Sequence, residues 1–261
     1  SDGHLNGCSS GLFHGRDTVR LNLLPIGDTM NFYKDGGDGT LEIPAVNSYV
    51  PCTMLQLARV LMVEGYAGCE LNAIITRSAR MVDDTTPEIL TAMVESEVFH
   101  KFNRMEGKSF MVGHEYDEPP GIFTTPAVPS LEGSLTADKV IAMIYSLSVR
   151  HRASAVFLCN PNMMRDLRHL KDGDGRFLYR DAMSAGEPAR LMDWPIYEDV
   201  DAPDNQLMFG NFRDGYTVSL NPVVTILRDP FSQKPNVLFF AHRRVGGQVE
   251  DGDCFRKLVA Q

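Results

Sequence analysis

One stretch restricts the fold of this chain more than any other, because residues 85–107 have the pattern of a single long amphipathic helix. Apolar residues recur at the three-and-four spacing of one buried helix face, at Ile89, Leu90, Met93, Val94, Val98, Phe99, Phe102 and Met105. A helix of about 21 residues spans roughly 30 Å, the width of a small domain. The sequence therefore predicts a long rigid helix, although the same pattern is typical of surface helices in many globular proteins.

The ends and the opposite face of this helix can also be assigned. Thr85 and Glu88 suit a capping box, Pro87 is tolerated in a first turn, and Gly107 is expected to end the helix. Polar side chains are expected to face away from the core at Glu95, Glu97, Lys101, Arg104 and Glu106. Because that face is only slightly acidic, we do not expect it to bind DNA.

The bulk composition limits the class of protein. A chain of 261 residues forms one large domain or two small ones with an ample core, and no apolar run is long enough to cross a membrane. The formal net charge of −9 argues against a free-standing nucleic-acid binder, which would show a basic surface. It leaves open a protein that encloses nucleic acid without binding it tightly.

No recognisable catalytic or metal-binding motif occurs in the sequence. The histidines and cysteines lack the spacing of a zinc site, and the scattered cysteines suit small buried thiols better than a disulfide framework. The segment Asp172–Gly175 has only half of a calcium loop, and neither a phosphate-binding glycine loop nor a GxSxG elbow is present. We therefore expect no catalytic, cofactor-binding or metal-ligating residues and no cofactor. A soluble α+β hydrolase remains a remote alternative.

The first 78 residues divide into two parts. Residues 1–34 are polar and glycine-punctuated, which indicates an extended arm that takes its stability from a neighbour. Residues 35–78 contain the strand-like segments Thr40–Val46 and Leu55–Val63, joined by a polar tip at residues 47–49. The sequence therefore predicts a long hairpin, and its unpaired edges favour oligomerisation.

From Thr136 onward the pattern alternates between helix and strand. Helices are predicted over Ala137–Val149 and from Pro161 through His169, the second capped by Asn160, and a tight turn over Asp172–Gly175. Strands are predicted at Ser154–Leu158, Pro195–Tyr197, Leu207–Asn211, Tyr216–Leu220, Val223–Arg228 and Val237–His242. The fold class is therefore α+β, with a sheet-rich C-terminal third.

Six short motifs follow one another in the second half of the chain: Asn160–Leu178, Leu191–Ile196, Phe209–Tyr216, Arg228–Phe231, Arg244–Gly247 and Phe255–Leu258. In order and spacing they resemble the tailed-bacteriophage major capsid protein family, except that Asp193 stands where the family usually has glycine. The earlier chain resembles the family too. Gly39–Pro44 is similar to the start of its extended loop, the helix at 85–107 to its spine helix, and Gly113–Ile122 to its glycine-rich linker.

This resemblance implies a tailed-phage major capsid fold divided into five parts. They are an N-terminal arm (1–34), an extended β-hairpin loop (35–78), a peripheral domain with the spine helix 85–107 (79–124), an axial α/β domain (125–222), and C-terminal strands that complete the peripheral domain and return toward the axial domain (223–261).

The resemblance also implies a function. The chain is expected to be a non-enzymatic subunit that assembles as pentamers and hexamers into an icosahedral shell around packaged double-stranded DNA, in a virion assembled in the bacterial cytoplasm. Portal, scaffold, maturation-protease and cement or decoration proteins are implied partners, and no membrane is. An absent initiator Met fits the family's removal of a scaffolding segment. An encapsulin-like compartment around a cargo enzyme is the closest alternative.

Some members of the family cross-link a lysine of the extended loop to an asparagine of another subunit. This sequence has no lysine between Lys34 and Lys101. We therefore predict a shell without that covalent bond.

Overall fold

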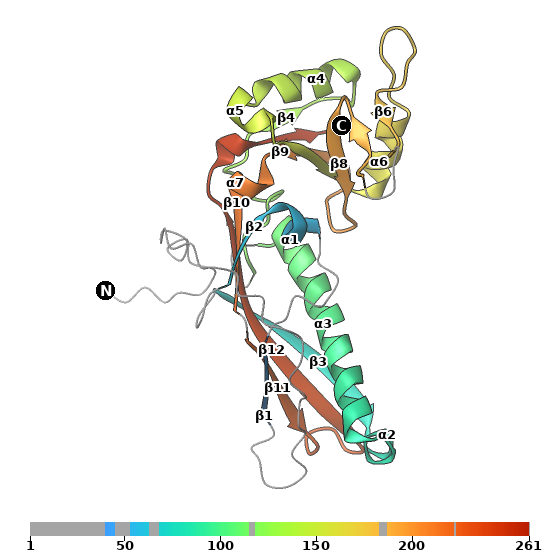
Figure 1. The fold of residues 1–261 in the computed structure, drawn as a ribbon, viewed down its shortest axis with the longest axis vertical. Coiled ribbons are helices and arrows are strands. Elements are labelled where there is room, and N and C mark those ends of the chain that lie inside the picture. The colour runs from blue at the N-terminus through green and yellow to red at the C-terminus, as the bar shows by residue number, and fades with distance from the viewer. Residues whose placement is uncertain are drawn as a thin grey trace, which may run out of the picture.

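The computed structural model describes residues 40–44, 53–62, 68–114, 118–182, 187–221 and 223–260, of which 40–44 only as backbone. The molecule is elongated, with a long lower sheet flanked by one long helix and a more compact upper part (Figure 1). The expected arm and the expected hairpin tip lie outside the described residues. None of the helices in the described ranges is long and apolar enough to cross a membrane.

The lower sheet is built around one long strand. β12 (Asn236–Val249) pairs antiparallel with β3 (Cys69–Ser78) along its first ten residues and with β10 (Tyr216–Leu220) along its last five. β11 (Val223–Asp229) also pairs with β12, while β1 (Thr40–Pro44) and β2 (Arg59–Met62) form the edges, in the order β1-β11-β12-β10-β2. The prediction at 237–242 thus covers less than half of a strand that spans about 46 Å at 3.3 Å per residue.

The helix α3 (Pro87–Val112) covers one face of this sheet. Side chains alternate along β3 and, as far as Val245, along β12, and those facing α3 are buried: Cys69, Leu71, Ala73 and Ile75 in β3, and Val237, Phe239, Ala241, Arg243 and Val245 in β12. This alternation follows from the two-residue period of a strand, so burial of one face fixes the register.

The prediction of a long helix is confirmed, but both predicted ends are wrong. The N-cap residue is Thr86 and not the predicted Thr85, and Thr86 makes no side-chain capping bond. The Thr85 hydroxyl donates to the Met81 carbonyl at 2.6 Å, at the end of the short helix α2 (Ala79–Asp84). Gly107 is buried inside the helix, which runs on to Val112. A helical glycine costs about 1 kcal/mol relative to alanine, and burial of Phe110 and Met111 offsets that cost.

The predicted hairpin has the wrong pairing. Thr40–Pro44 is a strand, but it pairs with β11, whereas Leu55–Val63 divides into the helix α1 (Thr53–Leu57) and the strand β2, which pairs with β10. The two segments therefore lie at opposite edges of the same sheet. Sequence patterns do not distinguish a local hairpin from pairing with distant strands.

The upper part contains a sheet in the order β4-β13-β9-β5-β8-β7-β6. Its strands are Ser130–Glu132 (β4), Val156–Cys159 (β5), Tyr179–Arg180 (β6), Arg190–Leu191 (β7), Trp194–Glu198 (β8), Gln206–Gly210 (β9) and Phe255–Val259 (β13). The helices α4 (Ala137–Ser146) and α6 (Pro161–Arg168) pack around this sheet, and short helices lie at α5 (Val149–Arg152), α7 (Phe212–Gly215) and the 3₁₀ turn η2 (Gly252–Cys254).

Most predictions for the upper part are confirmed. The Asn160 side chain accepts from the Met163 amide at 2.7 Å, as expected of an N-cap, and the Asp172 carboxylate closes the predicted turn by accepting from the amides of Asp174 and Arg176. The helix predicted over Ala137–Val149 ends at Ser146, and α5 follows separately. Cys159 and Cys254 are free and buried as expected, whereas Cys69 is disulfide-bonded, contrary to the expectation of free thiols.

Candidate functional site at the junction of the two sheets

Three connections in the described chain run between the lower and upper sheets. They lead from α3 to β4, from β9 through α7 to β10, and from β12 through η2 to β13. Figure 1 shows that they meet where the elongated lower part joins the upper part. The sequence predicts no catalytic, cofactor-binding or metal-ligating residue, so this junction, which contains several of the capsid-like motifs, is the candidate functional site.

The connection from β9 to β10 is held by Asn211. Its side chain accepts from the Asp214 amide at 3.4 Å and donates to Asp214 Oδ2 at 2.7 Å, so it caps α7, and its backbone amide donates to the Cys254 carbonyl at 3.0 Å. The Phe212 ring meets the Phe255 ring edge-on, with centroids 5.2 Å apart. These contacts tie the β9–β10 connection to the β12–β13 connection.

Two glycines of the Phe209–Tyr216 motif permit this close approach. A Cβ atom on Gly210 would lie 2.4 Å from the Cys254 carbonyl oxygen, and one on Gly215 would lie 2.4 Å from the Phe255 ring. Both distances are far below van der Waals contact, so any side chain would push the two connections apart. The glycines of this capsid-like motif therefore have a direct packing role.

The connection from α3 to β4 folds back along the end of α3. The amide of Gly121 donates to the Gly113 carbonyl at 3.0 Å, and the amide of Phe123 donates to the Met111 carbonyl at 3.0 Å. The Lys257 ammonium donates to the Phe123 carbonyl at 2.8 Å, and desolvation by burial lowers the pKa of Lys257. Although acidic residues replace most of the family's glycines here, these contacts fix the upper sheet against the C-terminal end of α3.

A buried ion pair lies along the same end of α3. Arg243 is at an inward position of β12, and its guanidinium contacts the Glu106 carboxylate, with both side chains fully buried. Burial raises the pKa of Glu106, and the Arg243 charge opposes that shift. The prediction that Glu106 faces solvent is wrong. It lies four residues from both Phe102 and Phe110, and this spacing could have placed it on the buried face.

The turn at Asp193 keeps the backbone shape that the family's glycine would allow. Met192 and Asp193 have φ angles of 47° and 75°, in the left-handed region that favours glycine. Aspartate tolerates this region better than most residues. Arg190 also donates to the Asp193 carbonyl at 2.9 Å, which holds the turn between β7 and β8.

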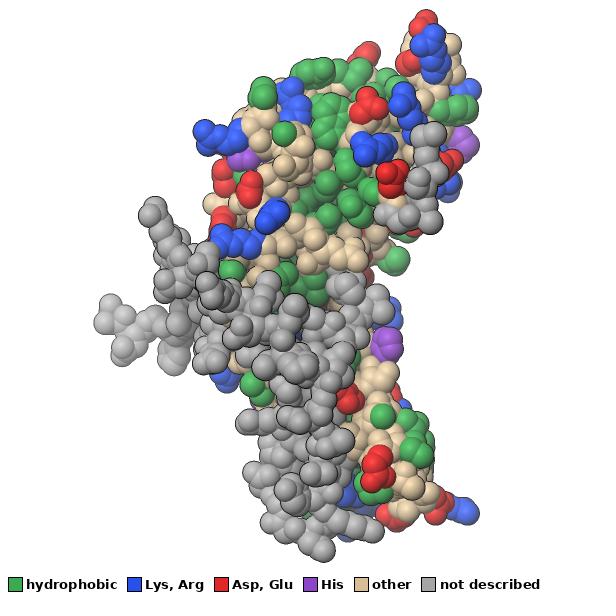
Figure 2. Space-filling model, viewed as in Figure 1, with side chains coloured by type: hydrophobic (Ala, Val, Ile, Leu, Met, Phe, Trp, Pro, Cys, Tyr) green, Lys and Arg blue, Asp and Glu red, His purple; other side chains and the backbone are tan. Residues whose placement is uncertain are grey.

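The face of the lower sheet opposite α3 carries a row of apolar side chains, which we call the outer row. Leu227, Phe240 and Ile74 are direct cross-strand partners on β11, β12 and β3. Ile74 is 55% exposed and Leu227 is 39% exposed. Figure 2 shows that hydrophobic side chains lie among acidic and basic ones on the described part of the viewed surface. Exposed apolar rows of this kind mark contact surfaces.

Comparison with known proteins gives a consistent result. The sequence profile of the phage capsid family matches residues 63–260. In structure, the chain is similar to the capsid of an empty GTA particle, at 29% identity and a TM-score of 0.66, covering 91% of this chain and 94% of the other. It is also similar to the capsid of the native GTA particle, at 29% identity and a TM-score of 0.67, covering 83% and 93%.

A more distant match shows the fold alone. The holo-SrpI encapsulin complex of Synechococcus elongatus has 12% identity and a TM-score of 0.60, and the match covers 90% of this chain and 96% of the encapsulin chain. No curated protein sequence matches the chain.

Proposed function

This chain belongs to the phage capsid family and is a structural capsid protein, and we propose that it assembles as pentamers and hexamers into an icosahedral shell around double-stranded DNA. The observation that carries the proposal is the match to the two GTA capsids at 29% identity over most of both chains. The shape supports it, because an elongated subunit with an exposed apolar row presents separate surfaces to several neighbours.

The five-part division expected from the sequence is part of this proposal. Residues 79–124 and the C-terminal strands of 223–261 would form the peripheral domain, with α3 as the spine helix and with β13 returning to the axial domain. Residues 125–222 would form the axial domain, except for β10, which pairs within the lower sheet. The joint burial of α3 against β3 and β12 supports the first unit, and the separate upper core around Phe157 and Phe209 supports the second. Residues 1–34 would be the arm and residues 35–78 the extended loop that reach neighbouring subunits, except for β3 at the end of that range, which packs within the lower sheet.

The proposed role is not enzymatic. Among the described residues, the arrangement closest to a catalytic one is the buried thiol of Cys254, 3.4 Å from His151 Nδ1. A nucleophilic cysteine needs a lowered pKa. Here burial, together with the nearby carboxylates of Asp251, Asp214 and Asp253, raises the pKa of Cys254 to about 12. In the absence of a bound cation, the thiol therefore stays protonated at neutral pH and is not an activated nucleophile.

Negative-stain microscopy of the purified protein tests the shell directly. Hollow angular particles or flat capsomers are expected, and a uniform 29.0 kDa monomer under all assembly conditions would contradict the proposal.

The contents of the particles separate the phage-like shell from an encapsulin-like one, whose fold this chain shares. DNA that resists nuclease until the particles are opened would support the phage-like shell, and a protein cargo without DNA would support the compartment. A virion assembled in the bacterial cytoplasm, with portal, scaffold, maturation-protease and cement or decoration partners, is part of the same proposal. Mass spectrometry of purified particles would identify those partners.

A further inference from the structure

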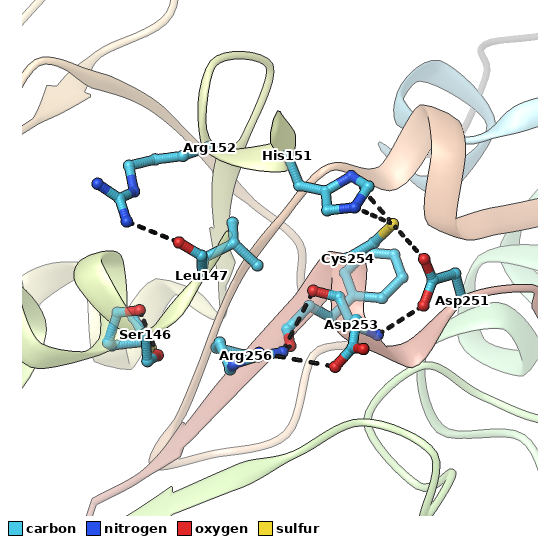
Figure 3. A network of polar contacts seen from close by, with 10 residues as sticks. Ser146, Leu147, His151, Arg152, Asp251, Asp253, Cys254 and Arg256 are labelled. Carbon is cyan, nitrogen blue, oxygen red and sulfur yellow. Dashed lines mark hydrogen bonds and ion pairs between the residues drawn. The ribbon is translucent and has the colours of Figure 1, made fainter. Parts of the chain in front are cut away.

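Three potential metal ligands from distant parts of the sequence meet at the junction. His151 lies on α5, and Asp251 and Cys254 flank the turn η2 between β12 and β13 (Figure 3). Cys254 Sγ is 3.4 Å from His151 Nδ1 and 3.6 Å from Asp251 Oδ2, and the ligand atoms of all three residues lie within 4.8 Å of one another. Because 103 positions separate the cysteine and the histidine, sequence spacing gives no sign of this cluster.

The geometry of the cluster fits one tetrahedral metal ion. Zinc binds cysteine sulfur at about 2.3 Å and histidine nitrogen or carboxylate oxygen at about 2.0–2.1 Å. At tetrahedral angles, a sulfur and a nitrogen ligand are then about 3.5 Å apart, and a sulfur and an oxygen ligand about 3.6 Å. The observed separations of 3.4 and 3.6 Å match these two edges, and the ligand atoms of His151 and Asp251 lie within 4.8 Å of each other.

The charges around the cluster favour a cation. The carboxylates of Asp251, Asp214 and Asp253 all act on the Cys254 sulfur. Of the basic side chains that line the same surface depression, Arg152 donates to the Leu147 carbonyl at 2.7 Å and Arg256 to the Phe255 carbonyl at 2.6 Å. The third, Arg150, is exposed to solvent. The depression also opens beside His151 and Asp251, which gives an ion and its water a route from solvent.

We propose that His151 Nδ1, Asp251 Oδ2 and Cys254 Sγ bind one zinc ion, with water as the fourth ligand. A thiolate, an imidazole and a carboxylate form a ligand set that suits zinc better than the hard cations calcium and magnesium. On binding, the Sγ–H proton leaves to solvent, bonds form from zinc to Sγ, Nδ1 and Oδ2, and the hydrated ion releases all but one of its waters.

The position of the site gives it a structural role. Since α5 belongs to the upper part and η2 is the connection from the lower sheet, the ion ties the two parts together at a connection that already has close packing at Gly210. A ligand that binds only the folded state stabilises it. Zinc therefore stiffens the junction between the two sheets.

Metal analysis of the purified protein tests the site. The chain is stripped with a chelator, exposed to micromolar zinc, separated from free metal by gel filtration, and measured by mass spectrometry. We expect one zinc per chain, and a thermal midpoint that zinc raises by about 5 °C. Titration with Co²⁺ should give the charge-transfer absorption of a thiolate–cobalt bond.

Matched variants separate this site from other cysteines and histidines of the chain. Cys254→Ser and His151→Ala should lose the zinc and the thermal shift, whereas Cys159→Ser and His169→Ala, which alter the same residue types elsewhere, should keep both. Asp251→Asn retains the acceptor for the Asp253 amide and should weaken zinc binding at least tenfold without preventing folding. The proposal would be overturned if Cys254→Ser retained zinc or if the folded wild-type chain bound none. The three residues would then form a hydrogen-bonded cluster and not a metal site.

Discussion

Arg243 Nη1 donates to Glu106 Oε1 at 2.7 Å, and neither side chain has any exposed surface. This ion pair joins the inner face of β12 to the C-terminal part of α3, the two longest elements of the described chain. Removing two charges from water is expensive, and only the partner charge and good geometry offset that penalty. The pair is therefore a sensitive point for the packing of helix on sheet.

Breaking the pair from either side should have unequal effects. Glu106→Leu removes the carboxylate that contacts a buried arginine, and arginine cannot lose its proton, so we expect a loss of about 3–5 kcal/mol in the free energy of unfolding. Arg243→Met should lower the free energy of unfolding by less, because Glu106 can take up a proton and become neutral. The double variant should be closer to wild type than Glu106→Leu alone. Urea unfolding of the unassembled subunit measures all three, and additive losses would contradict this coupling.

The Arg243→Met variant should also acquire a distinct pH dependence. Burial already raises the pKa of Glu106 above its ordinary value of 4.5 while Arg243 opposes the shift, so removal of the arginine raises it further. A raised folded-state pKa means that the folded chain holds the proton more tightly than the unfolded chain. Stability should then be greatest below pH 4.5 and fall as pH rises above it, compared with wild type. If the free energy of unfolding changed with pH in the same way in both proteins, the expectation would be contradicted.

Gly210→Ala should disturb the junction. The new Cβ would lie 2.4 Å from both the Cys254 carbonyl oxygen and the Phe255 ring, so we expect a loss of about 1–3 kcal/mol in stability and fewer closed shells. Gly173→Ala is the control, because no atom lies within 4 Å of its added Cβ. Thermal unfolding and particle counts by microscopy provide the measurement. Equal behaviour of the two variants would show that the junction tolerates expansion.

Ile74→Asp should impair assembly more than folding. Ile74 is 55% exposed in the outer row, so the charge costs the single subunit under about 1 kcal/mol, but it would be buried at an apolar contact between subunits. Asn72→Asp introduces the same charge on the same face of β3, opposite His242. Sedimentation should show unassembled Ile74→Asp subunits and normal Asn72→Asp particles. If both variants formed normal particles, the outer row would not be a contact surface between subunits.

Mature particles boiled in detergent should release a single monomer band. The expectation follows from the absence of lysine between Lys34 and Lys101, which leaves the extended loop without the cross-linking amine. Denaturing electrophoresis gives the answer, and a ladder of covalent multimers that persists under reducing conditions would refute it.

Sequence patterns were sufficient for several elements of the fold. The 3.6-residue period predicted α3, the Asn160 cap predicted the start of α6, and β10 was predicted over the same residues that form it. The start of α6 depends on contacts within a few positions, such as the Asn160 side chain with the Met163 amide. The alternating pattern of β10 was sufficient to predict a strand, although its partners β2 and β12 are distant in the sequence. The order and spacing of the capsid-like motifs, several of which lie at the junction, were sufficient to predict the family.

The tertiary structure decided what depends on distant residues. It continued α3 through Gly107, paired β1 and β2 with separate strands, and turned Glu106 inward toward a residue 137 positions away. It also brought His151 beside Cys254. Local propensities differ by about 1 kcal/mol or less per residue, whereas burial of one large side chain contributes about 1.5–3 kcal/mol. The sequence by itself therefore determined the family and most elements, and the packing of distant segments determined their ends, their partners and the junction that joins the two sheets.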